Sequence, residues 1–289
     1  MAGWLCHLTF RLTGTEVGRW LQCEAAIGPP RLHEGRPSPA LPIVHHGESN
    51  LSEQEDPKEG TAMTTAIIGV GQIGSGLARD LVGGGERVVL AARDDSHAQA
   101  LARELGDRAS AAPVREAITG ADVVVLAIWV DQSSALMPQI ADLLEGKIVV
   151  DPSNPIGFDD KGQAYRTLPE GTSAGSVVAG LLPTGAHYVK AFGSLGAPSL
   201  GSEANRSPRR AVLFYATDDD DAAAVIERLI TAAGFDPVKA GGVKDAGRIE
   251  VPGGDLHQNG GLNGQLLDVD QARAAVAASP PPRDAGATT

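Results

Sequence analysis

Short apolar runs alternate with segments of helical periodicity through most of the chain after residue 62. The run at 123–128 (VVVLAI) contains no polar residue, which is typical of a parallel strand buried on both faces of a sheet. Between such runs, apolar side chains recur at helical spacing, as with Ile73, Leu77 and Leu81. This alternation predicts an α/β fold built on a doubly wound parallel sheet.

The predicted elements extend from residue 65 to residue 278. Strands are expected at 66–68, 88–91, 123–128, 147–151, 187–193, 210–216 and 235–238. Helices are expected at 73–82, 96–105, 133–144, 172–182, 222–233 and 268–278. The polar stretch at 156–171 is expected to run over the edge of the sheet, and 194–210 is expected to be a loop.

A glycine-rich turn joins the first predicted strand to the first predicted helix, with the sequence Gly69-Val70-Gly71-Gln72-Ile73-Gly74. Gly69 permits a tight turn, Gly71 lets the backbone approach a pyrophosphate, and Gly74 allows the helix to pack closely on the strand. The N–H groups at the helix start would face the phosphates. Because the motif lies inside a strand–helix–strand unit, we interpret the fold as Rossmann-type and the turn as a dinucleotide site rather than a plain glycine-rich turn.

The residues after the second predicted strand distinguish NADP from NAD. NAD sites usually place an acidic residue here, which binds the ribose 2′-hydroxyl. This chain has Ala92 and then Arg93, whose guanidinium suits a 2′-phosphate, and Ser96 could add a hydroxyl. We therefore expect NADP(H). The alternative is that Arg93 is a solvated loop residue beside Asp94 and Asp95.

Two further strand ends supply candidate ligand contacts, because ligands of doubly wound sheets gather beyond the carboxyl ends of the strands. Ile128 and Trp129 follow one buried strand, and Trp129 could lie against a nicotinamide or substrate ring or could instead close the core. Pro152, Ser153 and Asn154 follow the next strand as a stiff polar turn. That turn could present hydrogen bonds to a ligand or be a plain turn.

Composition limits the partners. The 289 residues carry a formal net charge of -12, with 42% hydrophobic and 21% charged residues. So acidic a chain argues against nucleic acid as a partner. No apolar run approaches the roughly 18 residues of a membrane helix, so no membrane partner is expected. The protein is expected to be cytoplasmic. Both cysteines, Cys6 and Cys23, precede the glycine turn, which excludes thiol chemistry from the main domain.

The first 62 residues differ from the rest of the chain. They lack periodicity and are rich in proline, so they are expected to be a disordered leader, or a wrongly assigned start with translation beginning at Met63. The remainder is expected to form an NADP-binding domain at 63–193 and a small C-terminal α+β portion on the substrate side at 194–278. A disordered tail is expected at 279–289.

Two charged clusters are candidates for ligand contact. Arg206, Arg209 and Arg210 could attract an anionic substrate tail, although a solvated loop is the simpler interpretation. The acidic run at 217–221 precedes a predicted helix. A helix N-terminus favours carboxylates, so Thr217 or Asp218 is expected to cap that helix and the run is not expected to bind metal.

The glycine-rich segment at 246–261 contains His257, the one candidate proton donor of the chain. Asp255, Gln258 and Asn259 lie beside it, and their glycine neighbours would allow the backbone to approach a ligand. No compact ligand spacing such as HxxxH occurs, so no metal site is expected.

Five segments together resemble a known family. They are GVGQIGSGLARDLV at 69–82, AAR at 91–93, VVLAIW at 124–129, KIVVDPSNP at 147–155 and HYVKAF at 187–192. The pattern looks like that of the NADPH-dependent reductases of the deazaflavin coenzyme F420, over about residues 65–267. The resemblance implies a Rossmann domain whose small C-terminal portion folds over the cofactor cleft. It also implies a homodimer and reversible hydride transfer between the nicotinamide of NADP(H) and coenzyme F420 as co-substrate.

The resemblance also implies site residues. The pyrophosphate would be held by Gly69, Gly71, Gln72 and Ile73, and the 2′-phosphate by Arg93. The nicotinamide side would be lined by Ile128, Trp129, Pro152 and Asn154.

Two departures from the family pattern leave the acceptor open. Many relatives have asparagine where this chain has Gly193, and the segment at 253–268 differs from the family's arginine- and serine-containing C-terminal end. Direct hydride transfer requires little acid or base chemistry from side chains. The alternatives are therefore a reductase of flavin, ferric or imine substrates, or an NADP-binding sensor that catalyses nothing.

Overall fold

The computed structural model describes residues 63–278. The expectations for residues 1–62 and 279–289 concern segments outside the described residues. None of the helices between residues 63 and 278 has the length and hydrophobicity that crossing a bilayer requires.

Strands and helices alternate through the first half of the described chain, as the sequence predicts. This half contains β1 (Thr64–Ile68), α1 (Gln72–Gly83), β2 (Arg87–Ala91), α2 (Asp95–Leu105), β3 (Ala109–Ala111), α3 (Val114–Thr119), β4 (Val123–Leu126), α4 (Val130–Ile140), η1 (Ala141–Leu143) and β5 (Ile148–Asp151). The second half contains β6 (Ile156–Phe158), β7 (Ala164–Arg166), α5 (Ala174–Leu181), β8 (His187–Lys190), α6 (Ala197–Ser202), β9 (Val212–Ala216), α7 (Asp220–Ala232), β10 (Asp236–Gly241), η2 (Val243–Ile249) and α8 (Val269–Ala277).

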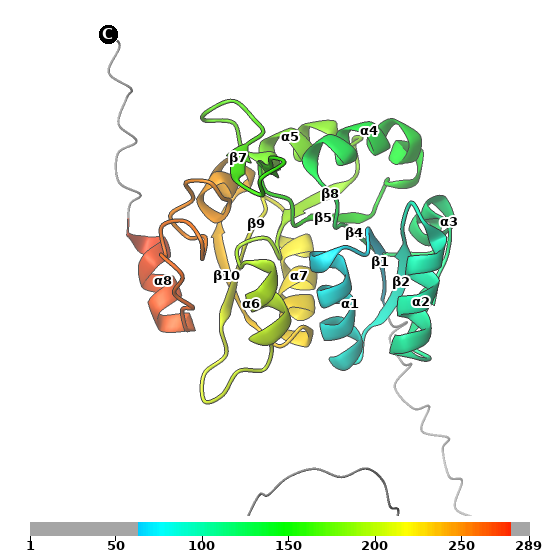
Figure 1. Cartoon of the computed structure of the whole chain (residues 1–289), viewed down its shortest axis with the longest axis horizontal. Helices are drawn as coiled ribbons and strands as arrows, with labels where there is room; N and C mark the ends of the chain where they lie inside the picture. The colour runs from blue at the N-terminus through cyan, green and yellow to red at the C-terminus, as the bar shows by residue number, and fades with distance from the viewer. Residues whose placement is uncertain (1–62, 279–289) are drawn as a thin grey trace, which may run out of the picture. The chain divides into compact units, whose positions relative to one another are not determined.

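One large sheet carries the fold, with strand order β10-β9-β8-β5-β4-β1-β2-β3 (Figure 1). All neighbouring pairs are parallel except β8 and β9. From β1 the chain moves outward through β2 to β3, and it then returns to β4 on the other side of β1. This order confirms the predicted Rossmann-type α/β fold. It also places the switch in strand order between β1 and β4, where such sheets bind ligands.

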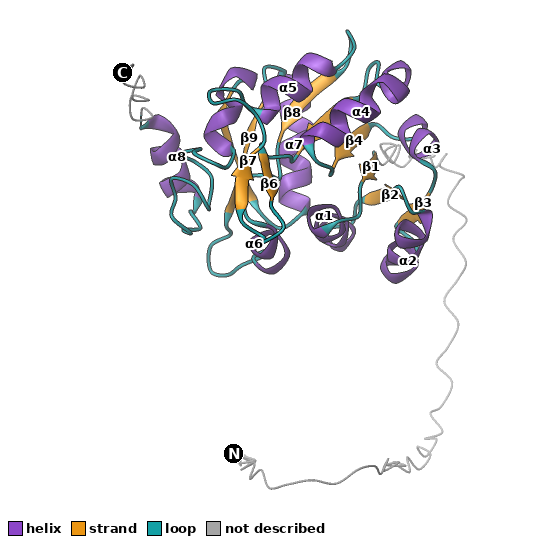
Figure 2. Ribbon diagram, turned by 45° about the horizontal axis from the view of Figure 1, so that its top comes forward, coloured by secondary structure: helices purple, strands orange, loops and turns teal. Residues whose placement is uncertain are grey.

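Alternate side chains of the strands form two cores, one on each face of the sheet. Ile67 packs with Leu77 and Leu81 of α1 on the face that α2 and α7 also cover. Its neighbours Ala66 and Ile68 belong to the core under α3, α4 and α5. Figure 2 shows helices on both sides of the strands. Because both faces are covered, the strands are apolar throughout, which is the pattern seen in the sequence.

The C-terminal segment extends the same sheet instead of forming a separate one. Strands β9 and β10 pair in parallel at its edge. Their outer face is covered by η2 and α8 through a third core that contains Phe214, Ile249, Leu256 and Ala272. The predicted boundary between 63–193 and 194–278 stays a prediction, because the sheet is continuous across it.

Two regions expected to be irregular contain regular structure. The stretch 156–171 holds an antiparallel hairpin of β6 and β7, which is separate from the large sheet (Figure 2). The stretch 194–210 holds the short helix α6, whose Leu200 is buried against the core shared with α1. Both segments are too short and too polar for periodicity to indicate them.

Candidate functional site

Loops at the carboxyl ends of the central strands touch one another in the order of the sheet. The N–H group of Gly69, after β1, donates to the carbonyl of Ala91 at the end of β2. A Cβ atom at Gly69 would lie 2.4 Å from the carbonyl oxygen of Ala127, after β4. The Nδ2 group of Asn154, after β5, donates to the carbonyl of Gly193, after β8, at 3.0 Å. The sheet therefore brings the predicted site segments into one continuous edge.

The three motif glycines have different roles in the structure. Gly69 has φ of +101°, which favours glycine, and Gly74 lies so close to Gly69 that a Cβ would be 1.9 Å from its carbonyl oxygen. Nothing lies within 4 Å of the position a Cβ would take at Gly71. Gly69 and Gly74 are therefore fixed by the fold, whereas Gly71 leaves open space in front of the turn.

The start of α1 is open to an anion. No side chain caps this helix, and its first turn has no acidic residue. By contrast, Asp94 caps α2 and Asp219 caps α7. An uncapped helix N-terminus beside an open glycine is what a pyrophosphate requires, since backbone N–H groups and the helix dipole then both face the phosphates. The turn at 69–74 fits a dinucleotide.

The loop after β2 presents one uncommitted arginine. Arg93 is exposed and forms no hydrogen bond or ion pair with any residue between 63 and 278. Asp94 is engaged, because its Oδ1 accepts from the backbone N and the hydroxyl of Ser96 at 2.9 and 2.6 Å. These bonds lower the pKa of Asp94. The Ser96 hydroxyl is therefore already bound to Asp94, the residue that caps α2. Arg93 follows the small Ala92 and is free to bind a 2′-phosphate.

Trp129 projects from the end of β4 at the switch point. It is 45% exposed and contacts Phe158 of the β6–β7 hairpin in an edge-to-face pair, with ring centroids 6.3 Å apart. Ile128 points back, and its Cγ2 lies 2.7 Å from where a Cβ of Gly69 would be. Trp129 is therefore not part of the buried core, and its contact with a nicotinamide or substrate ring stays a prediction.

The turn after β5 is fastened from several sides. Asn154 Oδ1 accepts from the N–H of Val251 at 2.8 Å, while its Nδ2 holds Gly193. A Cβ at Gly193 would lie 2.3 Å from the carbonyl oxygen of Pro152, which accounts for glycine at this position. Pro152 and Ser153 are buried. Asn154 thus joins three segments of chain with both ends of its amide, so its polar groups are already satisfied within the protein.

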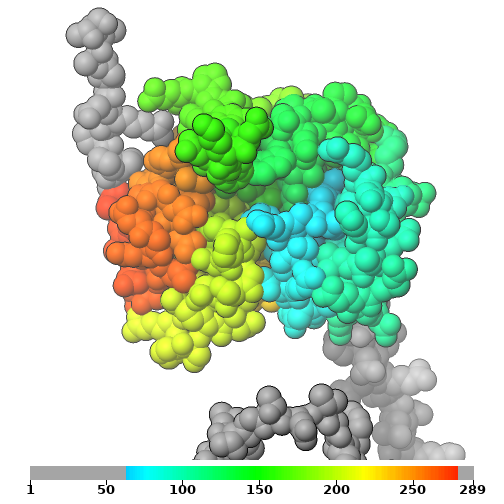
Figure 3. All heavy atoms as spheres, in the orientation of Figure 1, coloured from blue at the N-terminus to red at the C-terminus, as the bar shows by residue number. Residues whose placement is uncertain are grey.

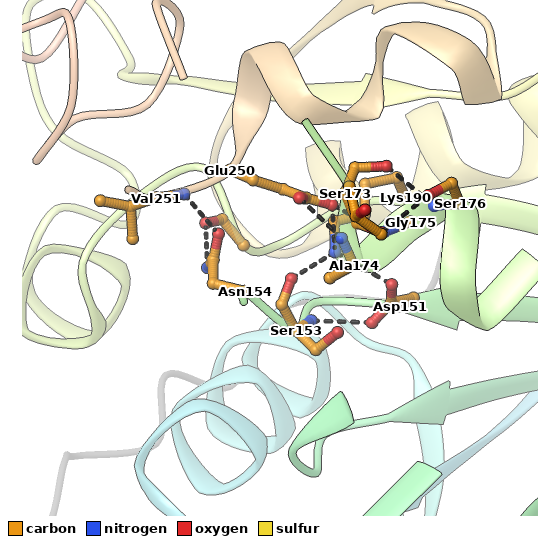
Figure 4. Close-up of polar contacts among 12 residues, drawn as sticks. Asp151, Ser153, Asn154, Ser173, Ala174, Gly175, Ser176, Lys190, Glu250 and Val251 are labelled. Carbon is orange, nitrogen blue, oxygen red and sulfur yellow. Dashed lines mark hydrogen bonds and ion pairs between the residues drawn. The ribbon is translucent and has the colours of Figure 1, made fainter. Parts of the chain in front are cut away.

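Directly beneath this turn lies a buried cluster of charges that sequence reasoning missed (Figure 4). Lys190 Nζ is 2.9 Å from Asp151 Oδ2 and 3.2 Å from Glu250 Oε1, and it also donates to the carbonyl of Ser153. Glu250 accepts from the N–H groups of Ala174 and Gly175, at the start of α5. Burial and the Asp151 carboxylate raise the pKa of Tyr188, whose hydroxyl donates to Asp151 at 2.8 Å. A lysine inside the predicted strand at 187–193 was the available signal.

The glycine-rich C-terminal segment packs on the loop after β8. Gln258 binds the N–H of Gly196 at 2.9 Å and the hydroxyl of Ser199 at 2.8 Å, while Asp255 pairs with Arg248. His257 is 2% exposed, and its Nδ1 accepts from the N–H of Asn259 at 3.0 Å. Burial lowers the pKa of His257 to about 4. Its imidazole is therefore neutral at pH 7, which argues against a role as proton donor.

The other charged clusters have structural roles. Arg209 pairs with Asp268 at 2.6 Å, and Arg210 donates to the carbonyl of Thr231 near the end of α7. That end of α7 contacts Gly84 and Glu86, which precede β2 and so lie at the opposite edge of the sheet from the glycine turn. The prediction that the acidic run caps the following helix is confirmed for α7. The capping residue is Asp219, however, and not Thr217 or Asp218, whose side chains bind other backbone groups.

Within residues 63–278, no three His, Cys, Asp or Glu side chains are grouped to hold a metal ion. The chemistry-bearing features of this part of the chain are an open phosphate cradle, a free arginine and exposed aromatic rings at the switch point. Together with the fold they are typical of a dinucleotide-binding protein of the Rossmann class.

Comparison with known proteins identifies the family within this class. A sequence model of the family described as NADP oxidoreductase, coenzyme F420-dependent, matches residues 64–155, and the chain belongs to this family. It is accordingly an NADP-dependent oxidoreductase, and the family supports NADP as the cofactor. None of the curated proteins matches the sequence.

Two solved structures show similarity over most of the described chain. The hypothetical protein SMa0349 of Sinorhizobium meliloti is 31% identical with a TM-score of 0.62, and the match covers 71% of this chain and 95% of that protein. A protein of Arthrobacter sp. FB24, provisionally assigned as an F420-dependent NADP reductase, is 25% identical with a TM-score of 0.56. That match covers 64% of this chain and 87% of the Arthrobacter protein.

Proposed function

We propose that this protein transfers a hydride between NADPH and a deazaflavin-type redox acceptor such as coenzyme F420. The observation that carries the cofactor half is the cradle at the switch point, where Gly71 is open, α1 is uncapped and Arg93 has no partner among residues 63–278. Family membership and the resemblance to the Arthrobacter protein support the acceptor half.

In this proposal the chain's own residues bind three parts of NADPH and support the loops that do so. The backbone of the 69–74 turn, including Val70, Gln72 and Ile73, holds the pyrophosphate, and Arg93 binds the 2′-phosphate. Ile128 and Trp129 flank the nicotinamide, while Asn154 holds the turn of Pro152 and Ser153 in position. Ala92 and Ser96 shape the loop around Arg93, Ser96 through its bond to Asp94.

When bound, NADPH would supply the hydride that reduces the acceptor ring, and the matching proton would come from solvent. No side chain has to act as an acid or base in such a transfer, so the protein contributes orientation and exclusion of water. The neutral, buried His257 fits this proposal as a structural residue.

Turnover of NADPH by the purified protein tests the proposal. NADPH oxidation is monitored at about 340 nm. It is expected to occur with oxidised coenzyme F420 and to be slower with free flavin, ferric chelates and cyclic imines. Faster reaction with an imine or a ferric chelate would assign another acceptor. Tight NADPH binding with no turnover of any acceptor would make the protein an NADP sensor.

A further inference from the structure

The buried cluster beneath the turn at 152–154 contains one cation and two anions. Lys190, Asp151 and Glu250 are each at most 2% exposed. Both ion pairs use the Lys190 ammonium, and no other cationic side chain among residues 63–278 forms an ion pair with either carboxylate. Tyr188 stays a neutral phenol, because burial and the Asp151 carboxylate raise its pKa. One positive and two negative formal charges leave the cluster with a single negative charge.

Backbone dipoles stabilise the second carboxylate in place of a second cation. Glu250 accepts from the N–H of Ala174 at 2.8 Å and from that of Gly175 at 2.7 Å, at the start of α5. A helix N-terminus carries only about half a positive charge, so it stabilises the carboxylate without cancelling its charge. Arg166 is half-buried and donates to backbone carbonyls, and water screens its charge more than that of the cluster. The excess negative charge therefore acts through a medium of low dielectric constant.

The cluster lies against the turn on the predicted nicotinamide side of the site. Lys190 donates to the carbonyl of Ser153, and Asp151 Oδ1 accepts from the N–H of Ser153 at 2.8 Å (Figure 4). The turn leads into the green segment of Figure 3 that contains the β6–β7 hairpin, and the molecular surface is hollowed between that segment and the blue start of α1. Since Pro152 and Asn154 are predicted to line the nicotinamide side, a bound nicotinamide would have the buried charge behind one of its walls.

We propose that the excess negative charge of the Lys190–Asp151–Glu250 cluster makes the protein bind NADP⁺ more tightly than NADPH, and so favours hydride donation from NADPH. This inference rests on the proposed function. The nicotinamide ring is neutral in NADPH and carries a positive charge in NADP⁺, so a buried negative charge nearby stabilises the oxidised form selectively. It also stabilises the positive charge that develops on the ring as the hydride leaves.

Nucleotide binding to variants of different cluster charge tests the inference. Dissociation constants for NADP⁺ and NADPH are measured by calorimetry without an acceptor, and the ratio of the two constants is compared between variants. Glu250→Gln removes the excess charge and is expected to shift the ratio toward NADPH by about tenfold. Lys190→Met adds a second negative charge and should shift it toward NADP⁺. The double variant carries one negative charge again and should return to the wild-type ratio.

Two further variants serve as a second test and a control. Asp151→Asn removes the same charge from the other anion, so it is expected to shift the ratio as Glu250→Gln does. Glu145→Gln removes an exposed carboxylate, which water screens, and should leave the ratio unchanged. Circular dichroism checks that each variant is folded under the conditions of the titration.

A purely structural role of the cluster gives a different result. Equal losses of affinity for both nucleotides in Glu250→Gln and Asp151→Asn would overturn the inference. Tighter binding of NADPH than of NADP⁺ by the wild-type protein would also overturn it, and this measurement needs no variant. If the ratio follows the cluster charge but no acceptor is reduced, the inference stands and the proposed hydride transfer fails. Reduction of an acceptor by a protein whose ratio ignores the charge would remove the inference alone.

Discussion

The side-chain nitrogen of Lys190 lies 2.9 Å from Asp151 Oδ2, and both side chains are fully buried. The three protons of the ammonium group have three acceptors, because Glu250 and the carbonyl of Ser153 take the other two. Glu250 is stabilised in turn by two N–H groups at the start of α5. The cluster therefore joins β5, β8, α5 and the residue that follows η2 under the turn at 152–154.

Removal of the Lys190 ammonium should destabilise the whole fold. Lys190→Met leaves two buried carboxylates without their cation, and such unpaired charges typically cost about 3–5 kcal/mol. The free energy of unfolding in urea is expected to fall by this amount. Lys244→Met, at an exposed lysine, is the matched control. A loss of less than about 1 kcal/mol would show that the cluster relaxes around the change.

Substitution of Gly74 should lower the stability of the fold, whereas substitution of Gly71 should lower the affinity for NADP⁺. In Gly74→Ala the new methyl would meet the carbonyl oxygen of Gly69 at 1.9 Å, so a loss of about 3 kcal/mol or more is expected. In Gly71→Ala the methyl meets nothing within 4 Å, and stability should change by less than about 1 kcal/mol. The same methyl stands where a pyrophosphate would approach, so NADP⁺ affinity should fall by about tenfold.

Thermal melts and NADP⁺ titrations of both variants check this separation. Wild-type affinity in Gly71→Ala would remove the pyrophosphate from the open side of the turn. A melting temperature of Gly74→Ala equal to that of the wild type would show that α1 can shift away from β1.

Periodicity and the glycine motif predicted the sheet, its helices and the cradle, because these depend on local pattern. The order of strands after β5 depends on pairing between distant segments, which local pattern does not encode, and the hairpin strands are too short and polar for periodicity to indicate. Asn154 was expected in a stiff polar turn at a strand end, and its predicted contact with a cofactor stays a prediction. Its partners Gly193 and Val251 are 39 and 97 residues away in sequence, so its structural role could not be read from the turn alone. Lys190 needed the same long-range information.

The free guanidinium of Arg93 should determine the preference for NADPH. A charge-assisted hydrogen bond contributes about 1.5–3 kcal/mol, so Arg93→Ala is expected to weaken NADPH binding by about tenfold to a hundredfold. NADH has no 2′-phosphate and should bind the variant as it binds the wild type. Dissociation constants from nicotinamide fluorescence measure both. Arg103→Ala, an exposed arginine of α2, is the control. Equal losses for both nucleotides would assign Arg93 another role.

His257 should make the protein sensitive to acid. Its pKa is lowered to about 4 in the fold, and it returns to about 6.5 on unfolding. Between these values only the unfolded chain binds the proton, so stability is complete above pH 6.5 and falls as the pH approaches 4. The loss amounts to roughly 3 kcal/mol. Urea midpoints of His257→Gln should show a flatter pH profile than those of the wild type and of His97→Gln, a change at an exposed histidine. Parallel profiles would contradict this assignment.

Asp80 should lower the stability of the protein as the pH rises, which is the opposite of the effect of His257. It lies in α1 and lines a cavity of about 390 Å³ between α1 and α6, where its Oδ2 has no hydrogen-bond partner among the described residues. Burial raises its pKa to about 7, and Arg79 offsets part of that effect. As the pH rises from 4 to 7 the unfolded chain releases this proton before the folded protein does, so the carboxyl group lowers stability increasingly up to pH 7. Because the group is partly exposed, solvent screening reduces the size of the effect.

Asp80→Asn keeps the shape without the charge and should raise the melting temperature at pH 8, with the difference disappearing near pH 4. A variant that melts below the wild type at pH 8 would show that the Asp80 carboxylate has a stabilising partner, for which Arg79 is the candidate.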